Sequence, residues 1–344
     1  MHTSKVIIDY PMSTSHLVDI FIGGDIMATG HIFIILIPIF FVILIGYFAG
    51  LFKAFNPASS KGLNTLVTKF ALPAHLFIGI TTTPRETLIQ KWPFLVALLL
   101  GVIGFYIVLL VGYRLIAKKA LTESSMFALN STQPSFAFMG IPVLGSLFGS
   151  AAVAIPIAIT GIVVNAILDP LASILGTVGQ RKTTEADAKG NLFKATLKSV
   201  LHGLSEPLAC VPLIGVVLTL CGFQAPKLLQ SMFDQLGNIT SGTALFAIGV
   251  TIGIKKITFS PKALSIAVLK AIVMPIVMLG IAVLIGLSHE DVTKAVLLVA
   301  FPGSAVAAMI ATRYETLETE AASAFVISSV LSLISLPLLI SLLI

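Results

Sequence analysis

Charged residues are scarce in this sequence, and their scarcity excludes a soluble protein. Only 10% of the 344 residues are Asp, Glu, Lys or Arg, whereas a soluble domain averages about 25%. Hydrophobic residues make up 57%, and apolar stretches recur from residue 31 to the C-terminus. Because a helix needs roughly 20 apolar residues to cross a bilayer, the sequence predicts an all-α integral membrane protein.

Motifs of enzymes and of nucleic-acid binding are missing as well. No His-Glu-x-x-His, Gly-x-Ser-x-Gly or Cys-x-x-Cys pattern occurs, so a membrane-embedded enzyme is the least favoured alternative, and we expect no metal site and no cofactor. The two cysteines, Cys210 and Cys221, share one apolar stretch, where packing is their expected role. The 21 Lys and Arg residues form no basic stripe interleaved with aromatics, so we expect no nucleic-acid partner.

Ten apolar stretches are candidate membrane spans. They cover residues 31–52, 63–80, 94–116, 122–148, 151–175, 201–222, 232–254, 263–287, 291–312 and 317–343. We number these spans 1 to 10 in chain order. The sustained polar segment between spans 5 and 6 divides them into two sets of five. We therefore expect an N-terminal tail (1–30), a first five-helix unit (31–175), a loop (176–200) and a second five-helix unit (201–344).

The distribution of basic residues supports this count and sets an orientation. If the 176–200 loop is cytoplasmic, 16 of the 21 Lys and Arg residues fall on the cytoplasmic side and 5 on the other. Cytoplasmic loops of membrane proteins carry an excess of Lys and Arg. We therefore expect a multi-pass protein of the cell membrane with both termini on the non-cytoplasmic side.

The two five-helix units show weak internal similarity. At an offset of 168 residues, Glu123 corresponds to Asp291 and Pro134 to Pro302; at 169, Pro38 corresponds to Pro207 and Gly46 to Gly215. Because each unit holds an odd number of spans, the units would enter the membrane from opposite sides. The pattern predicts an inverted repeat, an arrangement typical of secondary transporters.

Spans 4 and 9 each carry a proline near the middle, next to polar or glycine residues. Proline removes a backbone donor and breaks the helical hydrogen bonding. Inside a membrane the freed groups are tolerated only where protein, water or a ligand satisfies them. Either these prolines merely kink their helices, or the two spans are interrupted and together bind a substrate. The candidate binding residues are Asn130, Gln133, Pro134, Ser135, Pro302, Gly303 and Ser304.

Other polar residues within the spans each allow two interpretations. His75 beside Pro73 either relays protons or contacts an anion, or it is a packing residue. Asp169 and Asn165 line a path or bind a coupling ion, or Asp169 caps a helix. Lys270 is expected to extend toward the cytoplasmic face. A polar cluster in span 7 either binds a cation or packs small residues against a neighbouring helix, and it includes Asn238, Ser241 and Thr243.

Three short motifs carry a resemblance to a known family. They are Phe70-Ala71-Leu72-Pro73 in span 2, Met139-Gly140-Ile141-Pro142 after Pro134, and the Pro302 segment that ends in Ala311-Thr312-Arg313-Tyr314. Together, and in this order, they resemble the auxin efflux carrier family, which includes plant PIN-type carriers and bacterial malate and malonate permeases. The resemblance covers essentially all of residues 31–344.

The resemblance implies a fold and a function. The fold would be similar to bile-acid symporters and sodium/proton antiporters, with broken helices 4 and 9 crossing at the substrate site. The function would be transport of small organic anions (mono- or dicarboxylates, or auxin-like acids) by alternating access, in a homodimer, with proton, sodium or no coupling. An anion or ion channel is the alternative. Family members often have Asn where this chain has Ser135, which implies room for a different or larger anion.

Overall fold

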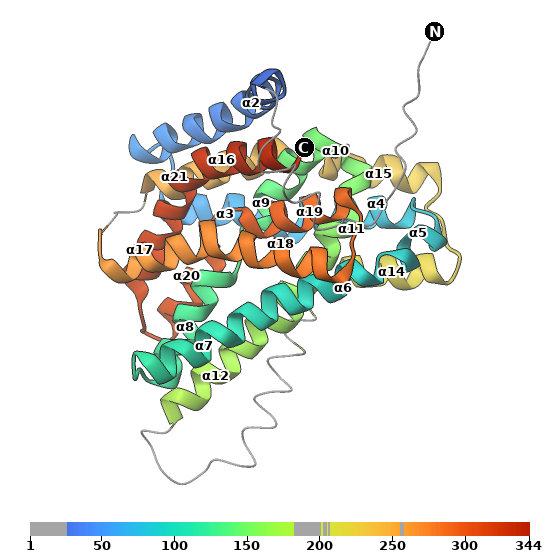
Figure 1. The fold of residues 1–344 in the computed structure, drawn as a ribbon. Helices are drawn as coiled ribbons and strands as arrows, with labels where there is room; N and C mark the ends of the chain where they lie inside the picture. The colour runs from blue at the N-terminus through green and yellow to red at the C-terminus, as the bar shows by residue number, and fades with distance from the viewer. Residues whose placement is uncertain (1–25, 182–200, 202–204, 206, 255–257) are drawn as a thin grey trace.

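Helices form the regular structure throughout the described residues of the computed structural model, which are 26–181, 201, 205, 207–254 and 258–344 (Figure 1). The first half contains α2 (Ile26–Leu51), α3 (Pro57–Leu66), α4 (Leu72–Thr81), α5 (Arg85–Gln90), α6 (Trp92–Leu98), α7 (Phe105–Ile116), α8 (Leu121–Thr132), α9 (Phe136–Met139), α10 (Gly145–Phe148), α11 (Ser150–Gly161) and α12 (Asp169–Arg181). The second half contains α14 (Pro207–Leu220), α15 (Lys227–Gly237), α16 (Thr240–Ile254), α17 (Pro261–Val268), α18 (Met274–Ile285), α19 (His289–Ala300), α20 (Ala305–Arg313) and α21 (Glu318–Leu343).

Among the described residues, five π-helical segments connect or continue these helices. They are η1 (Val67–Ala71), η2 (Leu99–Gly104), η3 (Gly140–Leu144), η4 (Ile162–Leu168) and η5 (Leu269–Val273). A π segment widens the helical turn by one residue, and such segments occur often at functional sites. Two of them, η2 and η5, lie in the first halves of predicted spans 3 and 8.

Within the described residues, six helices are long and apolar enough to cross a membrane: Pro57–Thr81, Arg85–Ile116, Ser150–Gln180, Lys227–Ile254, Pro261–Ile285 and Glu318–Leu343. Shorter apolar helices, Ile37–Leu51, Phe136–Phe148 and Cys210–Leu220, lie in predicted spans 1, 4 and 6. The structure is thus that of a helical integral membrane protein.

Several helix ends differ from the predicted boundaries. Helix α2 begins at Ile26, inside the predicted tail, and α12 continues to Arg181, inside the predicted loop. The rest of the tail (1–25) and of the loop (182–200) lies outside the described residues. Hydropathy marks only the apolar part of a helix, so the polar last turn of α12 is missed.

Helices α2 and α16 pack with unusually close backbones. Two glycine pairs, Gly46 with Gly50 and Gly249 with Gly253, each spaced by four residues, lie at the contact. A Cβ atom placed on Gly249 would lie 2.1 Å from the carbonyl oxygen of Ile43. Small residues at this spacing let membrane helices approach closely, so the glycines hold the first helix of one half against the second half.

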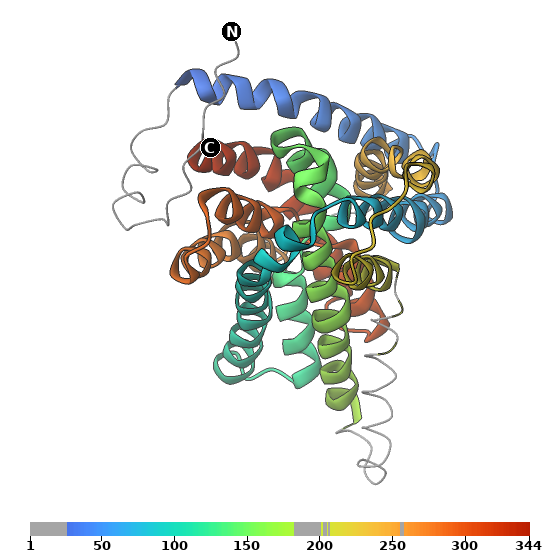
Figure 2. The same cartoon turned by 90° about the vertical axis from the view of Figure 1, so that its right-hand side faces the viewer.

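The two helices that lead into the candidate site, α8 and α19, are buried over most of their length. Every side chain from Ser124 to Ser135, and from Val292 to Gly303, is buried. Helix α8 packs between α7 and α12, and Figure 2 shows these three helices running side by side. The polar side chains of α8 bond its neighbours: Ser125 Oγ donates to the carbonyl of Ala172, and Thr122 Oγ1 to that of Gly176.

Candidate functional site

Spans 4 and 9 are interrupted, the first at Pro134 and the second at Pro302. Helix α8 ends at Thr132, Gln133 adopts an extended conformation (ψ 118°), and α9 begins only at Phe136. Likewise α19 ends at Ala300, Phe301 is extended (ψ 150°), and α20 begins at Ala305. Proline has no backbone N–H and cannot donate a helical hydrogen bond. Three residues, 133–135, separate α8 from α9, and four residues, 301–304, separate α19 from α20.

The two unwound segments lie against each other. The backbone N–H of Ser135 donates to the carbonyl of Pro302 at 2.8 Å, and Pro134 and Gly303 form an isolated antiparallel bridge. The side-chain amide of Asn130 donates to the carbonyl of Met126 at 2.9 Å and, across the contact, to that of Ala307 at 3.4 Å. Segments 168 residues apart in the chain thus form one backbone junction, which we call the crossover (residues 133–135 and 302–304).

The polar groups at the crossover are shielded from solvent and incompletely paired. Asn130, Gln133, Ser135 and Ser304 are each at most 8% exposed. Gln133 Nε2 donates to Asp169 Oδ2 at 3.2 Å, and Asn165 lies one turn before Asp169. The buried polar atoms without a hydrogen-bond partner within the described residues include four in and beside the crossover segments: Ser131 Oγ, Thr132 Oγ1, Gln133 Oε1 and Asn165 Nδ2. Native proteins pair nearly all such atoms, so this cluster has unused capacity for a polar ligand.

The structure does not join every sequence-predicted residue to the crossover. His75 packs against α15, where a Cβ on Gly237 would lie 3.3 Å from His75 Nδ1. Asn238 is exposed in the turn between α15 and α16, and Ser241 and Thr243 lie in the first turn of α16. Among the described side chains, no hydrogen bond links these four residues to the crossover. His75 and the span 7 cluster therefore take no part in the Gln133–Asp169 hydrogen bond.

Lys270 was expected to extend toward the cytoplasmic face, and this prediction is wrong. Its side chain is 0% exposed, and Nζ donates to the carbonyl of Val299 in the last turn of α19. The available signal was the position of one lysine well inside an apolar span, since intramembrane charges are costly and often functional. The short distance of Lys270 from the cytoplasmic end of span 8 favoured a side chain that reaches the membrane surface. That distance does not tell whether the side chain faces the lipid or the protein interior.

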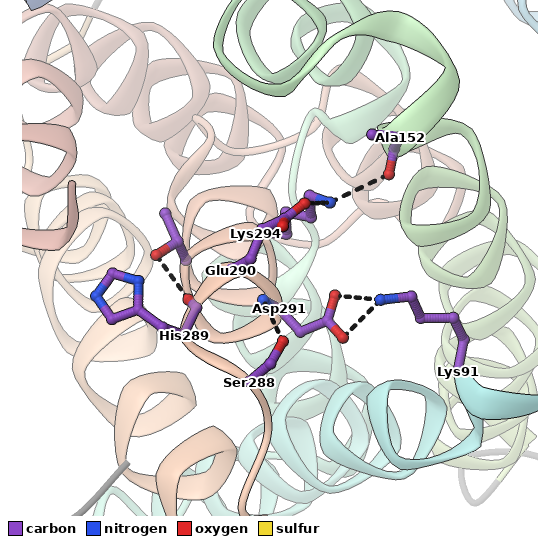
Figure 3. Close-up of polar contacts among 8 residues, drawn as sticks. Lys91, Ala152, Ser288, His289, Glu290, Asp291 and Lys294 are labelled. Carbon is purple, nitrogen blue, oxygen red and sulfur yellow. Dashed lines mark hydrogen bonds and ion pairs between the residues drawn. The ribbon is translucent and has the colours of Figure 1, made fainter. Parts of the chain in front are cut away.

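Ion pairs form at the N-terminal ends of α8 and α19, the ends away from the crossover. Figure 3 shows Lys91, just before α6, reaching Asp291 in the first turn of α19, with Nζ 2.7 and 2.6 Å from the two carboxylate oxygens. In the same view, Lys294 contacts Glu290 and donates to the carbonyl of Ala152 at 3.2 Å. At the start of α8, Glu123 pairs with Lys262 of α17 at 3.0 Å.

The Lys91–Asp291 pair is expected to stabilise the fold measurably. The two side chains are 23% and 13% exposed, between a surface pair and a buried one, so we expect a coupling energy of about 1–2 kcal/mol. A double-mutant cycle of Lys91→Met and Asp291→Asn, followed by unfolding in detergent, measures it. Lys119→Met is the control, since Lys119 is 40% exposed and 4.0 Å from Glu123. Additive effects of the two substitutions would contradict the expectation.

Tyr314, at the end of the third motif, fastens α20 to α12. Its hydroxyl donates to the carbonyl of Ser173 at 2.6 Å and lies 3.1 Å from Thr177 Oγ1. Its own carbonyl accepts a hydrogen bond from Gln180 Nε2 at 3.1 Å. The tyrosine therefore connects the far end of the interrupted span 9 to the helix that begins with Asp169.

Comparison with known proteins places the chain in a family. Residues 31–340 match the family described as "Membrane transport protein". The chain is 28% identical over 304 residues to "Uncharacterized transporter YfdV" of Escherichia coli (strain K12), covering 88% of this chain and 95% of the relative. It is 26% identical over 306 residues to the "Putative malonate transporter" of Rhizobium meliloti (strain 1021), covering 87% and 91%.

A more distant similarity covers only part of a longer animal protein. The "Lysosomal cholesterol signaling protein" of Mus musculus is 25% identical over 236 residues, which are 65% of this chain and 26% of that protein. The family match extends over nearly the whole chain, and the two bacterial relatives match almost from end to end. The chain therefore belongs to the membrane transport protein family, that of the auxin efflux carriers its motifs resemble, and it is a multi-pass membrane transporter, not an enzyme.

Proposed function

We propose that this transporter carries small carboxylate anions across the cell membrane by alternating access, and that the anion binds at the crossover. The observation that carries the proposal is the contact between two interrupted helices, in which Ser135 N–H meets Pro302 O among buried, incompletely paired polar groups. Interrupted helices that meet near the membrane midplane form the substrate sites of many secondary transporters.

The chemistry of the crossover suits a carboxylate. The first turn of α20 directs backbone N–H groups toward Ser304, and the start of a helix carries partial positive charge. Gln133, Ser135 and Ser304 offer amide and hydroxyl donors from both segments. Asn130, whose amide already donates to Met126 and Ala307, would hold the two segments in place around the anion. On the other side of Gln133, Asp169 and Asn165 provide oxygens for a coupling proton or sodium ion. His75, Asn238, Ser241 and Thr243 would act along the path, at a distance from the bound anion.

We further propose that the helices form ten spans in two inverted five-helix repeats, residues 31–175 and 201–344, joined by a cytoplasmic loop at 176–200. The ion pairs support this arrangement. Glu123, in the first turn of span 4, pairs with Lys262 at the start of span 8, and Asp291, in the first turn of span 9, pairs with Lys91 at the start of span 3. Each half thus ties its interrupted helix to the other half in the same way.

In this arrangement spans 3, 4, 5, 8, 9 and 10 would move as a transport domain against a scaffold of spans 1, 2, 6 and 7. The close contact between α2 and α16 lies within the scaffold, and the ion pairs lie within the transport domain. The bias of basic residues supports a cytoplasmic 176–200 loop and non-cytoplasmic termini. By resemblance to the plant carriers, the assembly would be a homodimer.

Transport of malonate tests the proposal directly. The name of the Rhizobium relative makes malonate the first probe. In proteoliposomes we expect saturable uptake of labelled malonate and counterflow driven by unlabelled malonate inside. Runs with and without sodium, and with and without a pH gradient, identify the coupling ion. Ohmic currents without counterflow would favour a channel, and a panel of mono- and dicarboxylates without uptake would contradict the substrate class.

A further inference from the structure

Lys270 is the one lysine of the described residues with an exposed fraction of 0%. It lies in η5, inside the helix Pro261–Ile285, and η5 packs against α8, α19 and α21. Its ammonium donates to the carbonyl of Val299, in the last turn of α19. The carbonyls at the end of a helix point along the axis beyond its last residue. The ammonium is therefore at the end of α19 that leads directly into the crossover.

The interruption of span 9 explains why this carbonyl is available. In a continuous helix the carbonyl of Val299 would accept from the N–H four residues later, that of Gly303. In the structure the Gly303 N–H instead donates to Ser328 Oγ at 3.0 Å. The break thus frees the Val299 carbonyl, and Lys270 takes the place of the missing donor.

The charge of Lys270 is not neutralised by a nearby carboxylate. Within the described residues, Lys91, Lys262 and Lys294 each lie within 3.0 Å of a carboxylate oxygen, of Asp291, Glu123 and Glu290 respectively, whereas none lies within 4.0 Å of Lys270. An ammonium has three N–H donors, and one acceptor is present here. The negative end of the α19 dipole offers partial compensation, but a buried unpaired charge is costly.

From these observations we propose that Lys270 supplies the positive charge that binds a carboxylate of the transported anion at the crossover. The proposal rests on the proposed function and adds the residue that gives the site its preference for anions. The ammonium rests on Val299 O, and an arriving carboxylate accepts from its remaining donors. At the offset of 168 residues the first half has Val102, which is apolar and buried, so the charge comes from the second half alone.

The decisive variants separate the charge from the hydrogen bond. Lys270→Gln keeps a donor for the Val299 carbonyl without the charge, and Lys270→Arg keeps the charge. Lys262→Gln is the matched control, because Lys262 lies eight residues earlier in the same helix, Pro261–Ile285, and pairs with Glu123. Affinity is measured on purified protein for malonate and for malonamide, its neutral diamide of similar size, and the folded state is checked by size-exclusion chromatography.

Wild type is expected to prefer malonate over malonamide by at least about ten-fold, the usual worth of a hydrogen bond to a charged group. Lys270→Gln should lose most of that preference, Lys270→Arg should keep it in part, and Lys262→Gln should keep it fully. An unchanged preference in Lys270→Gln would overturn the proposal and leave the lysine a structural cap.

The test also gives an answer if Lys270→Gln does not fold or if the proposed function itself is wrong. If Lys270→Gln does not fold, wild type and Lys270→Arg decide: equal affinity for malonate and malonamide in either one overturns the proposal. Failure of the proposed function is distinguishable, because wild type would then bind none of the carboxylates in the panel and show no counterflow. If wild type transports malonate and Lys270→Gln keeps the full preference for malonate over malonamide, only the role proposed for Lys270 is wrong.

Discussion

Replacing Gly249 with alanine is expected to destabilise the folded protein by about 3 kcal/mol or more, the upper range for overpacking a close contact. The added methyl group would lie 2.1 Å from the carbonyl oxygen of Ile43 and 2.7 Å from the backbone nitrogen of Tyr47. Both neighbours are backbone atoms, so no side chain can rotate away and helices α2 and α16 must separate. Helix propensity alone would predict the opposite change in stability, because alanine is favoured over glycine inside a helix.

Gly242→Ala is the matched control for this prediction. Gly242 lies in the same helix, and nothing lies within 4 Å of a Cβ placed there. We expect the control to be neutral or stabilising, and Gly249→Ala to lower the thermal unfolding midpoint in detergent and the yield of monodisperse protein. Equal behaviour of the two variants would show that α2 and α16 do not cross as closely as described.

The sequence narrowed the prolines of spans 4 and 9 to two interpretations, a kink or an interruption, and did not choose between them. Proline alone does not end a helix, because Pro156 and Pro337 lie inside continuous helices of the same structure. Pro134 and Pro302 remove a backbone donor wherever they stand in a helix, and the helices end two residues before each of them. The partners of the freed groups could not be predicted, because they come from distant segments. Examples are Ser328, which accepts from the Gly303 N–H, and Lys270, which donates to the Val299 carbonyl.

The sequence did not show toward which neighbour each polar side chain of a span points. Lys270 and His75 both lie inside predicted spans, yet one supports the end of α19 and the other packs beside Gly237. Two further lysines within or next to spans, Lys91 and Lys294, find carboxylates from their own or another helix. The neighbour that a residue of a helix faces is decided by tertiary packing. In an apolar span the polar residues are too few to show which side of the helix faces the protein interior.

The four-residue spacing of Gly46 and Gly50, and of Gly249 and Gly253, was visible in the sequence. The spacing alone indicates that a helix can be approached closely, but it names no partner, and many glycines in this chain meet open space instead. The structure supplies the partner by placing span 1 against span 7. A scaffold built on this contact would stay rigid while the buried, polar crossover changes its exposure.

Replacing Gln133 with alanine is expected to weaken malonate uptake by about ten-fold or more while leaving the protein folded. The side chain joins the crossover to span 5 by donating from Nε2 to Asp169 Oδ2 at 3.2 Å, and its Oε1 has no partner within the described residues. Removal of the amide therefore deletes the donor to Asp169 and, at the proposed site, both a donor to the carboxylate of the bound anion and the acceptor Oε1. Ser135→Ala should act in the same direction, because the backbone bond to Pro302 O survives and only the hydroxyl is lost.

Ser124→Ala is the control for both substitutions. Ser124 is buried in the same helix as Gln133, but its hydroxyl bonds the carbonyl of Ala120 within its own turn, far from the crossover. Uptake of labelled malonate by proteoliposomes, normalised to the amount of folded protein, compares the three variants. The affinity should fall in Gln133→Ala and Ser135→Ala and stay unchanged in Ser124→Ala. Wild-type affinity in both crossover variants would move the anion site away from the two interrupted helices, because no bound carboxylate could then depend on their side chains.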